Sequence, residues 1–241
     1  MPLYALAAVP QISGGNTLEL VLVLVLLILC LAIHEVAHGW VALKCGDPTA
    51  RDLGRLTLNP VPHIDLFMTI ILPAMLFFMS QGRVIFGGAK PVPVDFHRLR
   101  HPWRDMSLVA LAGPLSNLLL AVLFVAALNF FVSSGLYNNA AATPYERQFD
   151  LLPRVLEASA GFNILLTVFN LIPVPPLDGS RVMAWLLPQG LRPAYVGLER
   201  YGLLIVFALI YLSPGFNRYL GMAKHTVRHA IDSVLAAGGL G

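Results

Sequence analysis

Three ionisable side chains stand close together inside a long apolar run: His34, Glu35 and His38, in the stretch HEVAH. On a helix, residues four apart lie on one face with Cβ atoms about 5–6 Å apart, so two such imidazoles can bind one zinc ion. Glu35 then lies beside the metal, where a carboxylate can activate water. Ionisable groups inside a membrane span are costly and usually functional. The stretch therefore predicts a hydrolytic metal site, against the alternative of two structural histidines bonded to the backbone.

A catalytic zinc ion takes three protein ligands and keeps one position open, so a third ligand must come from a distant residue. The best candidate is Asp178, in the stretch FNLIPVPPLDGSRV at residues 169–182, where three prolines break an apolar run. Unwound backbone at membrane depth is tolerated only where it is buried in protein or lines a cavity. Asp178 could equally cap a short helix over 179–187, and the local sequence leaves both roles open.

A third polar element, LAGPLSNLLL at residues 111–120, is expected near the start of another apolar span. Its small residues Gly113 and Ser116 are typical of close helix packing. Asn117 is different, because a buried amide needs partners or else serves a substrate.

The elements that must position these side chains are membrane helices. Of the 241 residues, 57% are hydrophobic and only 12% are charged, whereas soluble domains carry about 25% charged residues. Four segments are long and apolar enough to span a bilayer, at roughly 18–43, 106–132, 154–172 and 194–212. The arginines are scattered through short loops without a basic run, so no nucleic-acid surface is expected.

A fifth apolar segment, residues 64–80, is shorter and carries Pro73 near its middle. The loops on both sides of it, 44–63 and 81–105, are rich in Lys and Arg, whereas 133–153 holds a single arginine. Short cytoplasmic loops are enriched in Lys and Arg. Residues 64–80 are therefore predicted to enter and leave on the cytoplasmic side as a re-entrant hairpin, with a kinked span as the alternative.

Two smaller elements complete the expected fold. The runs Val84–Phe86 and Val92–Val94 surround Gly87–Gly88, which favours a small membrane-associated β-hairpin. The tail after Pro214 has spaced cations and apolar residues, which indicates an interfacial amphipathic helix or a solvated tail without a role.

The expected fold class is an all-α polytopic membrane protein with about four to six transmembrane or re-entrant helices and this β-hairpin. One membrane-embedded domain is expected over residues 1–241. Its core is expected at about 18–187, and the C-terminal span and interfacial helix at 194–235.

Together these pieces resemble the site-2 proteases, the zinc metalloproteases that cut within the membrane. The matching motifs are HEVAH (34–38), GPLSN (113–117) and NLIPVPPLDG (170–179), in this order on three apolar segments. FGGAKPVPV (86–94) is similar to the membrane-dipping β-hairpin of such proteases, and GRLTLNPVPHID (54–65) to their compact bacterial branch, without a PDZ or CBS domain.

The resemblance implies a zinc endopeptidase that hydrolyses peptide bonds within or near transmembrane segments of membrane proteins, as in regulated intramembrane proteolysis. It implies His34, His38 and Asp178 as ligands of one zinc ion. Glu35 would be the catalytic general base. Substrate-binding roles are implied for four further residues: Gly113, Pro114, Asn117 and Asn170.

Such a protease would be a multi-pass protein of the inner (plasma) membrane, with its active site toward the cytoplasmic side. Its partners would be the lipid bilayer and single-pass or other membrane protein substrates, and no nucleic acid. The main alternative is a catalytically silent membrane scaffold or binding protein that retains the fold, but the intact HEVAH and Asp178 argue against it. A metal transporter would need several coordinating residues along a path, and the chain offers one cluster.

Overall fold

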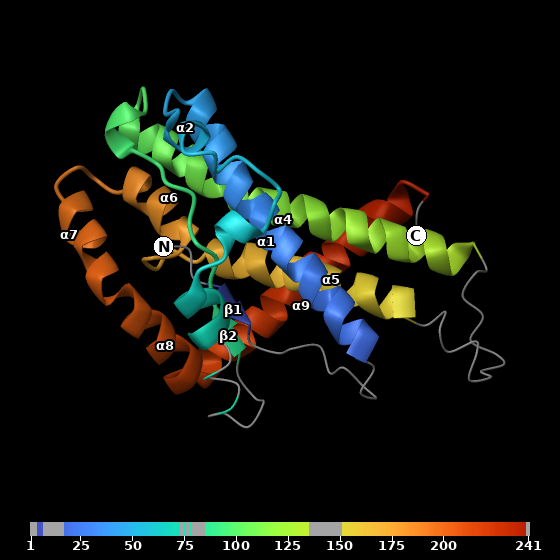
Figure 1. The fold of residues 1–241 in the computed structure, drawn as a ribbon. Helices are drawn as coiled ribbons and strands as arrows, with labels where there is room; N and C mark the ends of the chain where they lie inside the picture. Colours follow the sequence, from blue (N-terminus) through green and yellow to red (C-terminus); the bar gives the residue numbers. More distant parts are fainter. Residues whose placement is uncertain are drawn as a thin grey trace.

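The computed structural model describes residues 4–6, 17–72, 75, 78, 85–134 and 151–239 (Figure 1). Its helices and strands are β1 (Tyr4–Leu6), α1 (Thr17–Lys44), α2 (Thr49–Asp52), β2 (Ile85–Gly87), α4 (Pro102–Ser133), α5 (Leu151–Asn170), α6 (Asp178–Leu186), α7 (Arg192–Gly197), α8 (Gly202–Leu212) and α9 (Pro214–Ala237). Short 3-10 turns lie at Val61–His63, Phe96–Arg98 and Leu198–Tyr201, and a π-helical turn at Leu66–Ile71.

Four helical stretches are long and apolar enough to cross a membrane, which confirms the four spans predicted from composition. They are Val21–Lys44, Pro102–Ser133, Leu151–Asn170 and Arg192–Leu212. Helix α1, which contains the first of them, has Glu19 in its first turn and Lys44 in its last turn, charges that complement the helix dipole at both ends. The second begins at Pro102. Proline has no backbone N–H, so at the start of a helix it leaves no donor without a partner. The GPLSN motif therefore lies inside α4 rather than near its start.

The helices α1, α4 and α5 pack against one another, and α6 packs on α4. In Figure 1, α4 and α5 run side by side while α1 crosses them. Val23 and Leu27 of α1 are buried against Val155 and Phe162 of α5. Ala121 of α4 and Ala160 of α5 are both fully buried in one cluster, and such small residues let helix backbones approach closely.

The proline-rich break after α5 is partly buried: Ile172, Pro175 and Leu177 are buried, whereas Leu171 and Pro173 are exposed. Helix α5 ends at Asn170 and α6 begins at Asp178, with Ile172 and Leu177 packed into the core between them. A Cβ at Gly179 would lie only 2.5 Å from the carbonyl carbon of Leu171, so only glycine allows the start of α6 to pack against the end of α5.

The predicted re-entrant segment is described only in part, because residues 73–74, 76–77 and 79–84 lie outside the described residues. The chain that follows it returns to its beginning: the Gly88 N–H donates to the Met68 carbonyl at 2.9 Å, and the Lys90 N–H to the His63 carbonyl at 2.8 Å. The two ends of the stretch 64–89 therefore lie together, whereas its path through the bilayer stays a prediction.

The predicted β-hairpin is not formed among the described residues. Strand β2 pairs antiparallel with β1, with Tyr4 opposite Gly87, and residues 92–94 are irregular backbone rather than a strand. Pro91 and Pro93 have no N–H to donate to a ladder, and the Val92 N–H between them donates to a side chain of α1. The second arm of the hairpin thus has no backbone donor left over residues 91–93.

The tail forms the amphipathic helix α9, and its apolar face packs against protein. Leu220 lies in a buried cluster with Phe169 at the end of α5, and Ile231 lies in another with Ala160 of α5. The Arg228 guanidinium bonds Glu157 of α5 at 2.6 Å. Helix α9 therefore runs along α5 in the opposite direction, and its place at the membrane interface stays a prediction.

Candidate active site

The imidazoles of HEVAH and the carboxylate of Asp178 converge on one point. The Nε2 atoms of His34 and His38 lie 3.0 Å apart, and Asp178 Oδ2 lies 3.3 Å from the first and 3.4 Å from the second. All three residues are buried. Among the residues that the structure describes, they form the one group of three or more His, Cys, Asp or Glu arranged to hold a metal ion. The start of α6 thus meets the C-terminal half of α1, 140 residues before it in sequence.

This donor set fits a zinc ion. Asp178 Oδ2 is buried without a hydrogen-bond partner, which is costly for a charged oxygen and is relieved by a cation between it and the two nitrogens. Burial alone would raise the pKa of Asp178, but the His38 and His34 imidazoles beside it hold that pKa well below its usual range. This direction favours the ionised carboxylate, the form that binds a metal ion. Two nitrogens and one oxygen leave a fourth position of a tetrahedral zinc site open.

The capping role that the sequence left open for Asp178 is not the one seen. The N-cap of α6 is Leu177, and Asp178 is the first residue of the helix. Its side chain turns to the two imidazoles instead.

The hydrogen bonds of the two histidines fix which ring nitrogen faces the metal position. His38 Nδ1 lies 2.7 Å from the Val109 carbonyl, which can only accept, so Nδ1 carries a proton and Nε2 is the nitrogen that faces the metal position. His34 Nδ1 lies 2.5 Å from Asn117 Oδ1, with the same consequence. Partners of this kind orient metal-binding histidines and set their tautomer. Both acceptors belong to α4.

Gly113 allows α4 to lie against the ligands. A Cβ at this position would lie 2.5 Å from both Cε1 and Nε2 of His34, and closer still to Nε2 of His38. Pro114, inside the same helix, is buried, and its carbonyl accepts a hydrogen bond from Thr167 of α5 at 3.1 Å. The structure thus places Gly113 directly at the two imidazoles.

The two asparagines predicted to bind substrate are both fully buried. Asn117 uses both ends of its amide within the protein, since Oδ1 accepts from His34 and Nδ2 donates to Asn163 Oδ1 at 2.8 Å. Asn170 donates through Nδ2 to the Leu166 carbonyl at 3.0 Å, and its Oδ1 has no partner. Only Asn170 therefore keeps an unused polar atom, an acceptor. Substrate binding by these residues stays a prediction.

Glu35 is held by a backbone group that the sequence reasoning missed. The carboxylate is 1% exposed, and its Oε2 accepts a hydrogen bond from the Val92 N–H at 2.8 Å. The loop that carries Val92 is fixed in place by Arg55, which donates to the carbonyl of Lys90 at 3.0 Å. The signal in the sequence is the Pro-Val-Pro stretch, in which Val92 is the single backbone donor.

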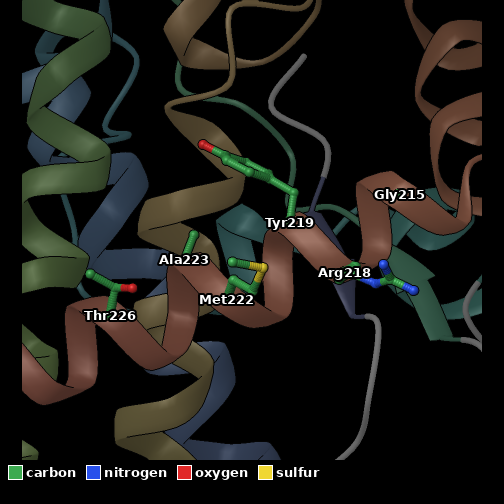
Figure 2. A pocket seen from close by; sticks show the side chains of 6 residues that line it. All are labelled: Gly215, Arg218, Tyr219, Met222, Ala223 and Thr226. Atoms are coloured by element: carbon green, nitrogen blue, oxygen red, sulfur yellow. The ribbon is translucent and has the colours of Figure 1, made fainter.

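A pocket on α9 shares no lining residue with this cluster (Figure 2). It is lined by Gly215, Arg218, Tyr219, Met222, Ala223 and Thr226. None of these described lining residues carries a carboxylate, imidazole or thiol.

Comparison with known proteins gives a consistent result. Residues 22–213 match the family model of Peptidase family M50. The chain is 38% identical over 189 residues to "Putative zinc metalloprotease YwhC" of Bacillus subtilis (strain 168), and the aligned region covers 78% of each protein. It is 30% identical over 193 residues to "Putative zinc metalloprotease Rip2" of Mycolicibacterium smegmatis, which covers 80% of this chain and 67% of that protein. No solved structure matches.

Proposed function

The chain belongs to peptidase family M50, and from this premise we propose that it is a zinc endopeptidase that cuts other membrane proteins within or near their transmembrane segments. The observation that supports this most is the buried cluster of His34, His38 and Asp178, in which both histidines lie on a helix long and apolar enough to span a membrane. The names of its relatives as zinc metalloproteases point the same way. A silent scaffold would not need a carboxylate buried against two imidazoles.

In this proposal His34, His38 and Asp178 hold one zinc ion. When bound, zinc polarises the scissile carbonyl and lowers the pKa of water to about 7. Glu35 follows His34 directly on α1 and acts as the general base: it takes the proton of the attacking water and passes it to the leaving amine nitrogen. The Val92 N–H at Oε2 restricts how the carboxylate can turn, so the base is oriented before substrate arrives.

The substrate contacts proposed for α4 and α5 follow from the atoms left available there. The unpaired Oδ1 of Asn170 can accept a backbone N–H of an extended substrate. Gly113 and Pro114 keep α4 close to the ligands, and Asn117 holds the His34 ring toward the metal position. A substrate helix hides its own N–H and carbonyl groups in internal bonds, so it must unwind locally before such contacts form.

We further propose a single domain in the inner (plasma) membrane, with the site toward the cytoplasm. The Lys and Arg residues of 44–63 and 81–105 support this orientation, because both loops adjoin the end of α1 near which HEVAH lies. The partners are then single-pass or other membrane proteins, in the manner of regulated intramembrane proteolysis.

The test is a Glu35→Gln variant in lipid vesicles with a tagged single-span protein that the wild type cleaves. We expect cleavage to be lost while bound zinc stays at one ion per chain, because the base is removed and the ligands remain. Glu19→Gln is the matched control: Glu19 lies on the same helix and is also buried, but it pairs with Arg154 at 3.7 Å, so cleavage should persist. Cleavage by Glu35→Gln near the wild-type rate, or a wild type without zinc, would refute the proposal.

A further inference from the structure

We infer that Asn163, on α5, is a positioning residue of the metal site: it fixes the Asn117 amide, and through that amide it fixes the tautomer and direction of the His34 ring. The inference rests on the proposed zinc site. Among the described residues, the Asn163 side chain has hydrogen bonds with Asn117, Ser159 and Cys30, and none of these is a proposed metal ligand.

A continuous chain of hydrogen bonds joins three helices here. Asn163 Oδ1 on α5 accepts from Asn117 Nδ2 on α4 at 2.8 Å, and Asn117 Oδ1 accepts from His34 Nδ1 on α1. All three side chains are 0% exposed. No water-facing group therefore competes for these bonds, and each amide is oriented by its protein partners.

This series of hydrogen bonds begins at a backbone carbonyl, which can act only as an acceptor. Asn163 Nδ2 donates to the backbone carbonyl of Ser159 at 2.8 Å, and a carbonyl oxygen only accepts. The same nitrogen lies 3.2 Å from Cys30 Sγ on α1. With Nδ2 committed, Asn163 must present Oδ1 to Asn117, and Asn117 must then present Oδ1 to His34.

The orientation matters because an amide has a donor end and an acceptor end. If Asn117 turned over, its Nδ2 would face His34 Nδ1, which would favour the ring proton on Nε2. Nε2 would then have no lone pair for the metal. Without Asn163, Asn117 loses the contact that distinguishes the two orientations, so part of the protein would carry His34 in the wrong tautomer.

The experiment measures zinc affinity in detergent by competition with a chromophoric chelator, on the full chain loaded with zinc. Loss of an outer partner of a metal ligand typically weakens binding by about 10–100-fold. We expect a loss in that range for Asn117→Ala, and a loss of about 10-fold for Asn163→Ala, whose effect is one step removed. Ser159→Ala is the matched control, since Ser159 lies one turn away on α5, is equally buried, and has a hydroxyl without a partner. It should bind zinc within about twofold of the wild type.

A double variant separates positioning from general packing. If Asn163 acts through Asn117, Asn163→Ala should cause no further loss of zinc affinity in an Asn117→Ala background, because coupled residues are not additive. If Asn163→Ala does not fold, Asn163→Ser replaces it: a serine can bond the Ser159 carbonyl one turn back but cannot reach Asn117. Wild-type affinity in the single variant, or full additivity in the double variant, would overturn the inference and leave the proposed function intact. A wild type that binds no zinc would instead overturn the proposed function.

Discussion

Replacing Gly113 by alanine should disable the metal site through a single methyl group. The added Cβ would lie 2.5 Å from Cε1 and Nε2 of His34, whereas non-bonded heavy atoms normally sit about 3.5–4.0 Å apart. The imidazole or α4 must therefore move by about 1 Å. Zinc–nitrogen distances of about 2.0–2.1 Å tolerate errors of only about 0.2 Å, so the ligand set cannot absorb this shift.

The size of the effect follows from the cost of overpacking, about 1–3 kcal/mol. If that cost falls on the metal-bound state, zinc affinity drops about 5- to 150-fold, since about 1.4 kcal/mol is tenfold. Cleavage should fall by about 100-fold, because a 1 Å displacement of reacting groups costs about that much. Gly161→Ala on α5 is the matched control, as its Cβ would meet only the flexible end of Lys224, at 3.1 Å from Nζ.

The measurements are zinc competition in detergent and cleavage of a tagged single-span protein in vesicles. Both should change together in Gly113→Ala and stay near wild type in Gly161→Ala. A Gly113→Ala protein that binds zinc and cleaves normally would show that α4 can move away from the histidines without cost, and the close approach would then have no part in the site.

Two further predictions concern Asp178 and the loop over Glu35. Asp178→Ala should lower bound zinc and abolish cleavage, whereas Asp65→Ala, which removes a cap bonded to Met68 N at 2.8 Å, should spare zinc; unchanged zinc in Asp178→Ala, measured by metal analysis, would remove it from the ligand set. Val92→Pro removes the N–H that holds Glu35 and should reduce kcat about tenfold or more with zinc retained, while Val92→Ala keeps the donor and should lose much less; equal loss in both would mean that the side chain, not the N–H, matters.

The parts of the site that could be predicted are those that local rules decide. Two histidines at i and i+4 share a helix face whatever surrounds them, so HEVAH could be interpreted without a fold. The four spans follow from length and composition. Asp178 is predicted on a different ground: a catalytic zinc ion needs a third protein ligand, and Asp178 lies at a helix end broken by prolines. That reasoning left a capping role open, which only the distances to His34 and His38 exclude.

The parts that could not be predicted depend on pairings between distant residues. The run 92–94 has β-branched residues, but whether it joins a sheet depends on where the Val92 N–H goes, and the Glu35 carboxylate, 57 positions earlier, accepts it. The partner of β2 is β1, a pairing over some 80 residues that no local pattern indicates. Strand propensity describes how well a segment fits its neighbours rather than an intrinsic choice of the backbone. The hairpin prediction paired β2 with residues 92–94, whereas the structure pairs β2 with β1.

Asn163 shows the same limit inside the membrane. In the run GFNILLTVFN it is one of three polar residues, with Thr167 and Asn170, and the sequence offers no reason to link it to a histidine 129 positions earlier. Asn163 is linked to His34 only because α4 places Asn117 between them. Most buried amides are hydrogen-bonded, and here Asn163 bonds Asn117, which in turn bonds and orients His34. Asn163, Asn117 and His34 are thus better understood as one hydrogen-bonded unit than as separate motifs. The effects of substitutions in this unit should therefore be non-additive when they are combined.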